Sequence, residues 1–355
     1  MKKVLLFTLA TIICTITVKA QIVHIPDANF KVALLNHTPI INTNGDGEIQ
    51  VSEAEAFTGK LLIPELKIAD ITGIEAFINI SALDCQNNQL TSLDVSSNIA
   101  LTDLACNDNS LTSLNLSNNT ALKKISCHRN NLINLDVSKN KFLQYLLCYN
   151  NKLTSLNLSS NTALRIISCD DNNLTNLDLS SNTALINISC DDNNLTNLDL
   201  SNSKFLQSIY CYSNSLTSLN VANKNNSSLK IFHADDNPNL TCIQVDDSTY
   251  SKSKWIGDSF GFDENVSFSE DCAITGVNDQ TANTNEIIFF PNPTTNQINF
   301  SAYINVRLTN LKGQSIIDRK NTNMLDISNQ AAGVYLLLFI NNNGEVVQRS
   351  KIVKE

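Results

Sequence analysis

The chain has 355 residues, a formal net charge of −9 at pH 7 and ten cysteines. An acidic chain lacks the basic face that a phosphate backbone requires, so its composition argues against nucleic acid as a partner. After the first twenty residues, no stretch approaches the ~20 apolar residues that a membrane-spanning helix needs. The sequence therefore predicts no transmembrane segment and no nucleic-acid partner.

Residues 1–20 have the pattern of a secretory signal peptide. Lys2 and Lys3 form a basic start, "VLLFTLATIICTITV" is an apolar stretch, and "VKA" provides small residues for cleavage after Ala20. Cys14 follows Ile13, where a lipid-anchoring cysteine would need a small neighbour. We therefore expect Cys14 to be discarded with the signal peptide and the mature protein to carry no lipid.

An N-terminal cap is expected over 21–79. "IPDANFKVALLNH" begins with the Pro-Asp pair typical of a helix start, and "NTNGDGEIQVSE" (42–53) leads into the helical "EAEAF". Helix, twelve-residue loop and helix make the layout of an EF-hand, with Gly47 at the sharp turn. The predicted calcium ligands are Asn42, Asn44, Asp46, Glu48 (through its carbonyl), Gln50 and Glu53.

Asn42 departs from the EF-hand pattern, which has aspartate at the first position. Losing one charged ligand weakens a site for a hard cation. The sequence requires no cofactor, and the one it offers a place for is a single structural calcium ion in this loop. The alternative is an Asn/Asp/Gly turn that only shapes the cap.

Residues 80–245 are an internal repeat with a period of 21 residues. The unit reads L-x-x-L-x-C-x-x-N-x-L-x-x-L-x-L-S-x-N-x-A, and "LTDLACNDNSLTSLNLSNNTA" (101–121) is a clean copy. An eighth turn from Leu229 has Ala234 in place of the cysteine. The repeated cysteines are Cys85, Cys106, Cys127, Cys148, Cys169, Cys190 and Cys211.

Each repeat contains two short apolar alternations, L-x-C and L-x-L, which are typical of strands with one face inward. One turn cannot bury its own apolar face, so turns must stack, with parallel strands roughly 4.8 Å apart. Asparagines recur where the chain bends, and their amides can bond backbone groups that the bend leaves unpaired. The first row is Asn88, Asn109, Asn130, Asn151, Asn172, Asn193, Asn214 and Asn237; the second is Asn98, Asn119, Asn140, Asn161 and Asn182.

The repeat resembles the leucine-rich-repeat family, and more narrowly the cysteine-bearing 21-residue repeats of internalin J-type surface proteins and many exported Bacteroidetes proteins. That resemblance implies a buried ladder of free thiols. The residues agree, because the cysteine takes an inward position otherwise filled by leucine and free cysteine packs as a small hydrophobe. The alternatives are disulfides between some turns, or a metal site, which would need ligands converging on one point.

A C-terminal cap is expected over 246–275. Cys242 and Cys272 fall outside the 21-residue spacing, and in an oxidising exterior they are natural disulfide partners. Closing a loop of that length stabilises by roughly 3–4 kcal/mol in the chain-entropy model. The alternative is two independent buried thiols.

The tail divides into a polar linker (276–285) and a small β-sandwich (286–355), indicated by short apolar runs between Pro, Gly and Asn signals. "PNP" (291–293), "LKGQ" (311–314), "LDIS" (325–328) and "GVY" (333–335) resemble the C-terminal sorting domain of the Bacteroidetes type IX secretion system. The resemblance implies contact with that machinery, export across the outer membrane, removal of the tail, and either release or attachment to surface lipopolysaccharide. The alternative is an ordinary adhesive Ig-like domain.

The sequence offers little chemistry. None of the four histidines lies in a motif with a nucleophile and an orienting carboxylate, and 80–245 contains no glutamate. The paired aspartates of the repeat "ISCDDNNLTNLDLS" (167–180 and 188–201) are expected to be solvated on a flat sheet rather than held in a cleft that would raise a pKa. We predict that the protein is not an enzyme.

Residues that flank the inward leucine and cysteine should form an outward face. Aromatic side chains beside charges on such a face suit recognition of protein or carbohydrate. The alternatives are an ordinary soluble surface, or cation binding by the aspartates. The candidate residues are Tyr145, Tyr149, Asp170, Asp171, Asp191, Asp192, Tyr210, Tyr212, His233 and Asp235.

Taken together, the sequence predicts a mainly β protein: a leucine-rich-repeat solenoid with a small helical EF-hand-like N-terminal cap and a C-terminal Ig-like β-sandwich. The expected function is secreted or cell-surface, non-catalytic binding in adhesion or recognition. The alternative is a structural surface-layer component without a specific ligand.

Overall fold

The computed structural model describes residues 21–272, 287, 289–290, 294–310, 313–341, 344 and 346–354. The chain divides into two compact units between Gly276 and Val277. The predicted signal peptide, the linker, "PNP" and the first two residues of "LKGQ" lie outside the described residues. Among the residues that are described, no helix is long and apolar enough to cross a membrane.

The first unit begins with a small cap. Helix α1 (Ala28–Leu35) starts at Asp27, whose carboxylate accepts the N–H of Phe30 at 2.9 Å. Helix α2 (Val51–Ala56) and the 3₁₀ helix η1 (Ile74–Ala76) follow. The apolar sides of α1 and η1 join the core of the stacked turns, so the cap closes one end of that core.

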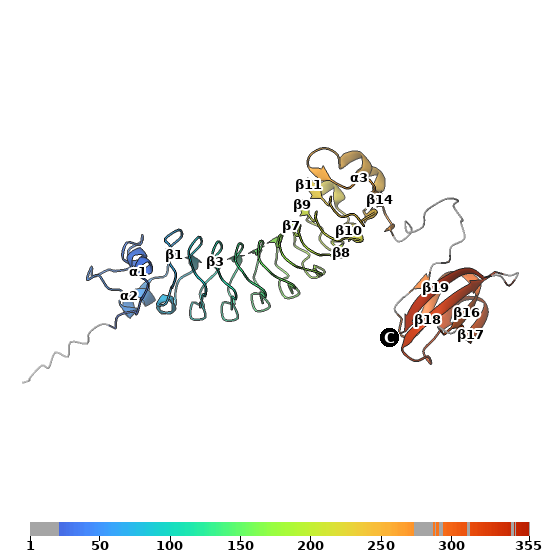
Figure 1. The fold of residues 1–355 in the computed structure, drawn as a ribbon, viewed down its shortest axis with the longest axis horizontal. Coiled ribbons are helices and arrows are strands. Elements are labelled where there is room, and N and C mark those ends of the chain that lie inside the picture. Colours follow the sequence, from blue (N-terminus) through green and yellow to red (C-terminus); the bar gives the residue numbers. More distant parts are fainter. Residues whose placement is uncertain are drawn as a thin grey trace, which may run out of the picture. The chain divides into compact units, whose positions relative to one another are not determined.

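The stacked turns share one long parallel sheet, which is visible along the upper part of the solenoid in Figure 1. Each turn contributes a strand of only two or three residues, whose middle residue points inward and whose flanking residues point outward. The order along the sheet is β1 (Lys60–Leu62), β2 (Ala82–Asp84), β3 (Asp103–Ala105), β4 (Lys124–Ser126), β5 (Tyr145–Leu147), β6 (Ile166–Ser168), β7 (Asn187–Ser189), β9 (Ser208–Tyr210), β11 (Ile231–His233) and β13 (Phe260–Gly261).

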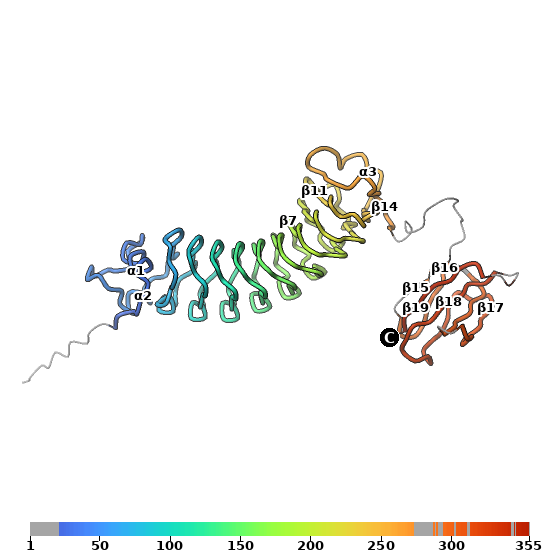
Figure 2. The backbone as a smooth tube through the Cα atoms, in the orientation of Figure 1, coloured from blue at the N-terminus to red at the C-terminus, as the bar shows by residue number. Residues whose placement is uncertain are grey.

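The opposite side of the solenoid differs from the expectation of two strands per turn. Only the last turns form a second sheet there, of β8 (Asn197–Asp199), β10 (Ser218–Asn220), β12 (Cys242–Gln244) and β14 (Ser267–Ser269). In earlier turns the L-x-L segments are coils. Figure 2 shows the path of the backbone through these turns. A hollow of about 440 Å³ on this side is lined by residues of two neighbouring turns, among them Asn157 and Asp178. Pairing between L-x-L segments begins only at β8 and β10.

The interior of the solenoid is a single core from cap to cap. All seven ladder cysteines are free and 0 % exposed. At the first bend, Asn172 donates to the carbonyls of Cys148 and Cys169 at 3.1 Å, and its side-chain oxygen accepts the N–H of Leu153 at 2.9 Å. At the second bend, Asn119 donates to the carbonyls of Val95 (2.9 Å) and Asn98 (3.0 Å). Both asparagine rows therefore tie each turn to the one before it.

The far end of the solenoid is closed by helix α3 (Ser248–Lys254) and by Trp255, which is buried against Phe232, Phe262 and Phe268. Cys242 and Cys272 form a disulfide. This cap covers the last apolar turn, as a repeat stack requires.

The second unit is an antiparallel sheet consistent with an Ig-like domain. Its strands are β15 (Phe289–Phe290), β16 (Gln297–Thr309), β17 (Ser315–Asp326), β18 (Gly333–Ile340) and β19 (Val346–Lys354). The long strand β16 pairs with both β17 and β18. The unit has a core of its own, which includes Leu308, Leu337 and Phe339.

Candidate ligand-binding face

The ladder cysteines are buried in the core of the solenoid, where a ligand at the surface cannot reach them. Burial raises the pKa of Cys85 and Cys127 to about 12 and that of Cys169 further. A thiol that stays protonated is a poor nucleophile and a poor metal ligand. Chemistry at the surface must therefore come from the outward residues of the same strands.

One outward position, directly after each ladder cysteine, forms a line across the sheet that we call the outer row. Its central part runs from His128 to Tyr212 over five neighbouring turns. The ring of His128 stacks on that of Tyr149, with centroids 4.2 Å apart. In the neighbouring line, Tyr210 stacks on His233 at 5.6 Å. The outer row consists of Gln86, Asn107, His128, Tyr149, Asp170, Asp191 and Tyr212, and Asp235 continues it after Ala234.

Asp170 and Asp191 are not solvated as the sequence predicted. Asp191 is only 6 % exposed, because it lies between Asp170 and Tyr212 in neighbouring turns. Burial raises the pKa of Asp170, and the negative charge of Asp191 raises it further. The hydroxyls of Ser168 and Ser189 donate to the two carboxylates and fix their orientation.

Asp171 and Asp192 are exposed, but they have a backbone role that the sequence analysis missed. Their φ angles are +50° and +49°, in the left-handed region that asparagine and aspartate adopt more readily than most residues. The signal was present in the repeat, since the same position is Asn or Asp in every turn except at Arg129 and Ser213. The residues at this corner are Asn87, Asp108, Arg129, Asn150, Asp171, Asp192, Ser213 and Asp236.

The edge of the face where the strands begin has a different character. The ammonium of Lys124 lies 5.4 Å from the ring centre of Tyr145 and 3.7 Å from the carboxylate of Asp103. Lys123 and Arg165, each directly before a strand, are exposed. The predicted face residues therefore lie in the strands of one sheet or just after them. Lys123, Lys124 and Arg165 lie along the edge where strands begin, beside Asp103, and the paired aspartates lie along the edge where strands end.

The EF-hand-like loop (42–53) has neither the entering helix nor the free oxygen atoms of a calcium site. Helix α1 ends at Leu35, and 36–41 separate it from the loop, so the entering helix does not adjoin the loop as the predicted layout required. The Asp46 carboxylate accepts from Asn44 (3.2 Å) and Gln50 (2.7 Å) side chains. Within the described residues, no group of three or more His, Cys, Asp or Glu side chains is placed to hold a metal ion. The EF-hand is not confirmed.

The remaining predicted ligands of the loop are engaged in the same way. The Glu53 carboxylate accepts the N–H groups of Thr43 and Gln50 at 2.7 and 3.0 Å. Glu48 forms an ion pair with Lys31 at 2.7 Å, and the side-chain oxygen of Asn42 accepts the N–H of Gly45. The oxygen atoms suit calcium in kind, but hydrogen bonds within the cap already hold them.

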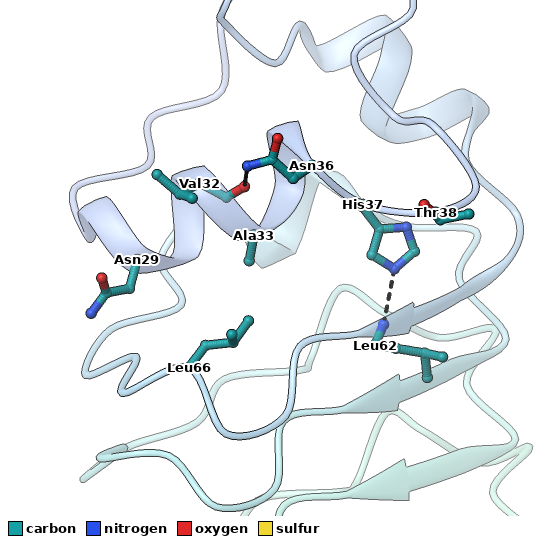
Figure 3. Close-up of a pocket in the computed structure, with 8 residues that line it drawn as sticks. All are labelled: Asn29, Val32, Ala33, Asn36, His37, Thr38, Leu62 and Leu66. Carbon is teal, nitrogen blue, oxygen red and sulfur yellow. Dashed lines mark hydrogen bonds between the residues drawn. The ribbon is translucent and has the colours of Figure 1, made fainter.

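A hollow of about 420 Å³ lies beside α1 (Figure 3). Its wall includes the exposed apolar side chains of Val32, Leu62 and Leu66. His37 links the two sides of the cap, because its Nε2 accepts the N–H of Leu62 at 3.1 Å while its Nδ1 lies 2.9 Å from the carbonyl of Pro39. No carboxylate lines this hollow, so it offers shape rather than catalytic groups.

Comparison with known proteins identifies both units. Residues 288–355 match the family described as the secretion system C-terminal sorting domain. An internalin of Listeria monocytogenes, InlF, superposes with a TM-score of 0.51 at 20 % identity over 72 % of this chain and 80 % of its own. The solenoid has the leucine-rich-repeat fold. The tail is a secretion sorting domain.

Two further structures from the same bacterium are similar to this leucine-rich-repeat chain. Another internalin has a TM-score of 0.50 at 21 % identity, covering 59 % of this chain and 94 % of its own. The functional domain of InlJ, described as including a cysteine ladder, gives 0.41 at 21 % identity over 96 % and 100 %. No curated protein sequence matches the chain. The two internalin structures with TM-scores of 0.51 and 0.50 show the fold of the solenoid, and its ligand has to be argued from the face.

Proposed function

We propose that the sorting domain delivers this protein to the cell surface or the medium, where the outward face of the long sheet binds a protein or carbohydrate partner without catalysis. The match over 288–355 supports export by type IX secretion, after which the tail is removed. The leucine-rich-repeat fold supports binding, because a stack of short strands presents a broad and rigid face.

The observation that carries this proposal is the composition of the outer row. Tyr149 and Tyr212 flank Asp170 and Asp191 at a position where the repeat itself demands no particular residue, since Asn107 and His128 also occupy it. Tyrosine gives a large contact area at little entropic cost, and it is enriched where proteins bind other molecules. The row therefore has the character of a binding surface.

The same geometry argues against glycoside hydrolysis. The two carboxyl groups of a glycosidase act from opposite sides of the glycosidic bond, with the substrate between them. Asp170 and Asp191 stand side by side on one face of the sheet, so they can approach a ligand only from the same side.

The test is an array of extracellular proteins and polysaccharides, probed with the chain from residue 21 onward. We expect saturable binding that is lost in Tyr145→Ala/Tyr149→Ala/Tyr210→Ala. A matched control, Thr154→Ala/Thr175→Ala/Thr196→Ala, changes exposed residues on the opposite side of the solenoid and should bind as the parent does. Binding to nothing on the array, or equal loss in both variants, would favour a structural surface-layer component.

A further inference from the structure

The outer row holds two negative charges that the chain does not compensate. Asp170 and Asp191 follow strands β6 and β7, which pair in register, so the two residues lie in adjacent turns roughly 4.8 Å apart. Neither takes part in any ion pair found among the described residues. Burial and the nearby charge of Asp191 both raise the pKa of Asp170, so they disfavour its charged state. A cation supplied by a partner would offset this cost.

Aromatic groups stand at both ends of this pair. Tyr149 precedes Asp170 by one turn and Tyr212 follows Asp191 by one turn, at the same position of the repeat. Tyr212 hydrogen bonds with Asp191, and Tyr149 is held from behind by the stacked ring of His128. Aromatic rings attract cations through their negative faces. The row therefore reads aromatic, acid, acid, aromatic, which favours an organic cation.

A metal ion fits this arrangement less well. Calcium takes six to eight oxygen ligands around one point. Here only two carboxylates stand side by side on an open sheet. Across the described part of the chain, no cluster of three or more His, Cys, Asp or Glu side chains is placed to hold a metal ion. A guanidinium is planar, bonds carboxylates through two N–H groups at once and stacks on aromatic rings. The chemistry of the row matches arginine better than it matches a metal.

The opposite edge of the face carries basic side chains that a larger ligand could also contact. Lys123, Arg165 and Lys230 are exposed directly before strands β4, β6 and β11. A partner that spans the face would meet carboxylates at one edge and basic groups at the other. A protein segment with arginine at one end and acidic residues at the other has that distribution, whereas a uniformly charged polymer does not.

We propose that the outer row binds an arginine side chain of a protein partner, with its guanidinium bridging Asp170 and Asp191 between Tyr149 and Tyr212. This proposal rests on the proposed binding function of the face and names the chemistry of its partner. The basic edge of the face then pairs with carboxylates of the same segment.

The test uses the peptide Gly-Arg-Gly-Arg-Gly-Arg-Gly as the probe, with calorimetric titration of the chain from residue 21 onward at low salt. Asp170→Asn/Asp191→Asn should weaken binding at least about tenfold, since two charge-assisted contacts are lost. The matched control is Asp178→Asn/Asp199→Asn, which removes the same charge from the same two turns on the opposite side. That control should bind as the parent does, and the peptide with glutamate in place of arginine should not bind. Circular dichroism verifies the fold of each variant.

Each other outcome decides against the arginine site. Equal weakening in the two double variants would show attraction to net charge alone. Displacement of the peptide from the parent by 1 mM calcium, lost in Asp170→Asn/Asp191→Asn, would show a metal site instead. If a partner from the array loses binding to the tyrosine variant but not to Asp170→Asn/Asp191→Asn, the face binds as proposed and only the arginine assignment fails. If nothing binds the face, both proposals fail.

Discussion

Cys169 and Asp170 are adjacent in sequence and lie on opposite faces of the same sheet. The inward residue recurs unchanged in seven turns and is 0 % exposed in each. The outward residue is replaced by Asn107, His128 or Tyr149 in other turns. The comparison teaches that the fold depends on the inward residue, which is the same in these seven turns. Binding specificity depends on the outward residue, which varies among them.

The largest expected effect is at the inward bend. Asn172→Ala removes side-chain hydrogen bonds to three carbonyls and the acceptor of the Leu153 N–H, so it should cost about 3 kcal/mol of unfolding free energy. The neighbouring Asn173 is exposed, and Asn173→Ala should change the free energy of unfolding by less than about 0.5 kcal/mol. Trp255, the only tryptophan, reports denaturant unfolding of this unit. Equal costs in the two variants would contradict an inward asparagine row.

A smaller effect on stability is expected from calcium at the N-terminal cap. This effect compares the repeats with a region outside them. Because calcium would have to displace the hydrogen bonds that Asn44 and Gln50 donate to Asp46, we expect 1 mM calcium to stabilise by no more than about 1 kcal/mol, the value for a weak extracellular site. Asp46→Ala should abolish the shift in melting temperature measured by calorimetry. An unchanged melting temperature in the parent would show that the loop is only a turn held by its own hydrogen bonds.

The smallest effect concerns the outward face. Asp170→Asn keeps an acceptor for Ser168 but removes a charge that burial and Asp191 disfavour, so it should slightly raise the melting temperature at pH 7. A carboxyl whose pKa is raised by folding destabilises the fold above that pKa. The advantage of the variant should therefore shrink as pH falls through the raised pKa, and vanish near the unfolded value of about 3.9. A melting temperature that falls at pH 7 would contradict the burial of this charge.

The sequence could predict most of the interior. The 21-residue period identified the inward cysteines and both asparagine rows because each follows from one turn stacking on the next. It could not predict that Asp191 is buried, since that depends on Tyr212 one turn later. It also predicted two strands per turn, whereas on one side only the last turns pair. Strand pairing between turns is a property of the stack that a single repeat does not encode.

The cap shows the same limit. The pattern of 42–53 resembles a calcium loop at every ligand position except Asn42, yet α1 ends at Leu35 and the loop's carboxylates accept hydrogen bonds from their own neighbours. A short pattern indicates which residue types are present. It does not fix the direction from which the preceding helix arrives, because tertiary packing sets that direction.

The inward position of the repeated residues is tested most directly by counting thiols in the chain from residue 21 onward. In the native protein, a thiol reagent at pH 8 should label none of the seven ladder cysteines, because burial raises their pKa and excludes the reagent. After denaturation without reductant, seven thiols should react, while Cys242 and Cys272 stay paired. Rapid labelling of the native protein, or fewer than five reactive thiols after unfolding, would contradict a buried ladder of free cysteines.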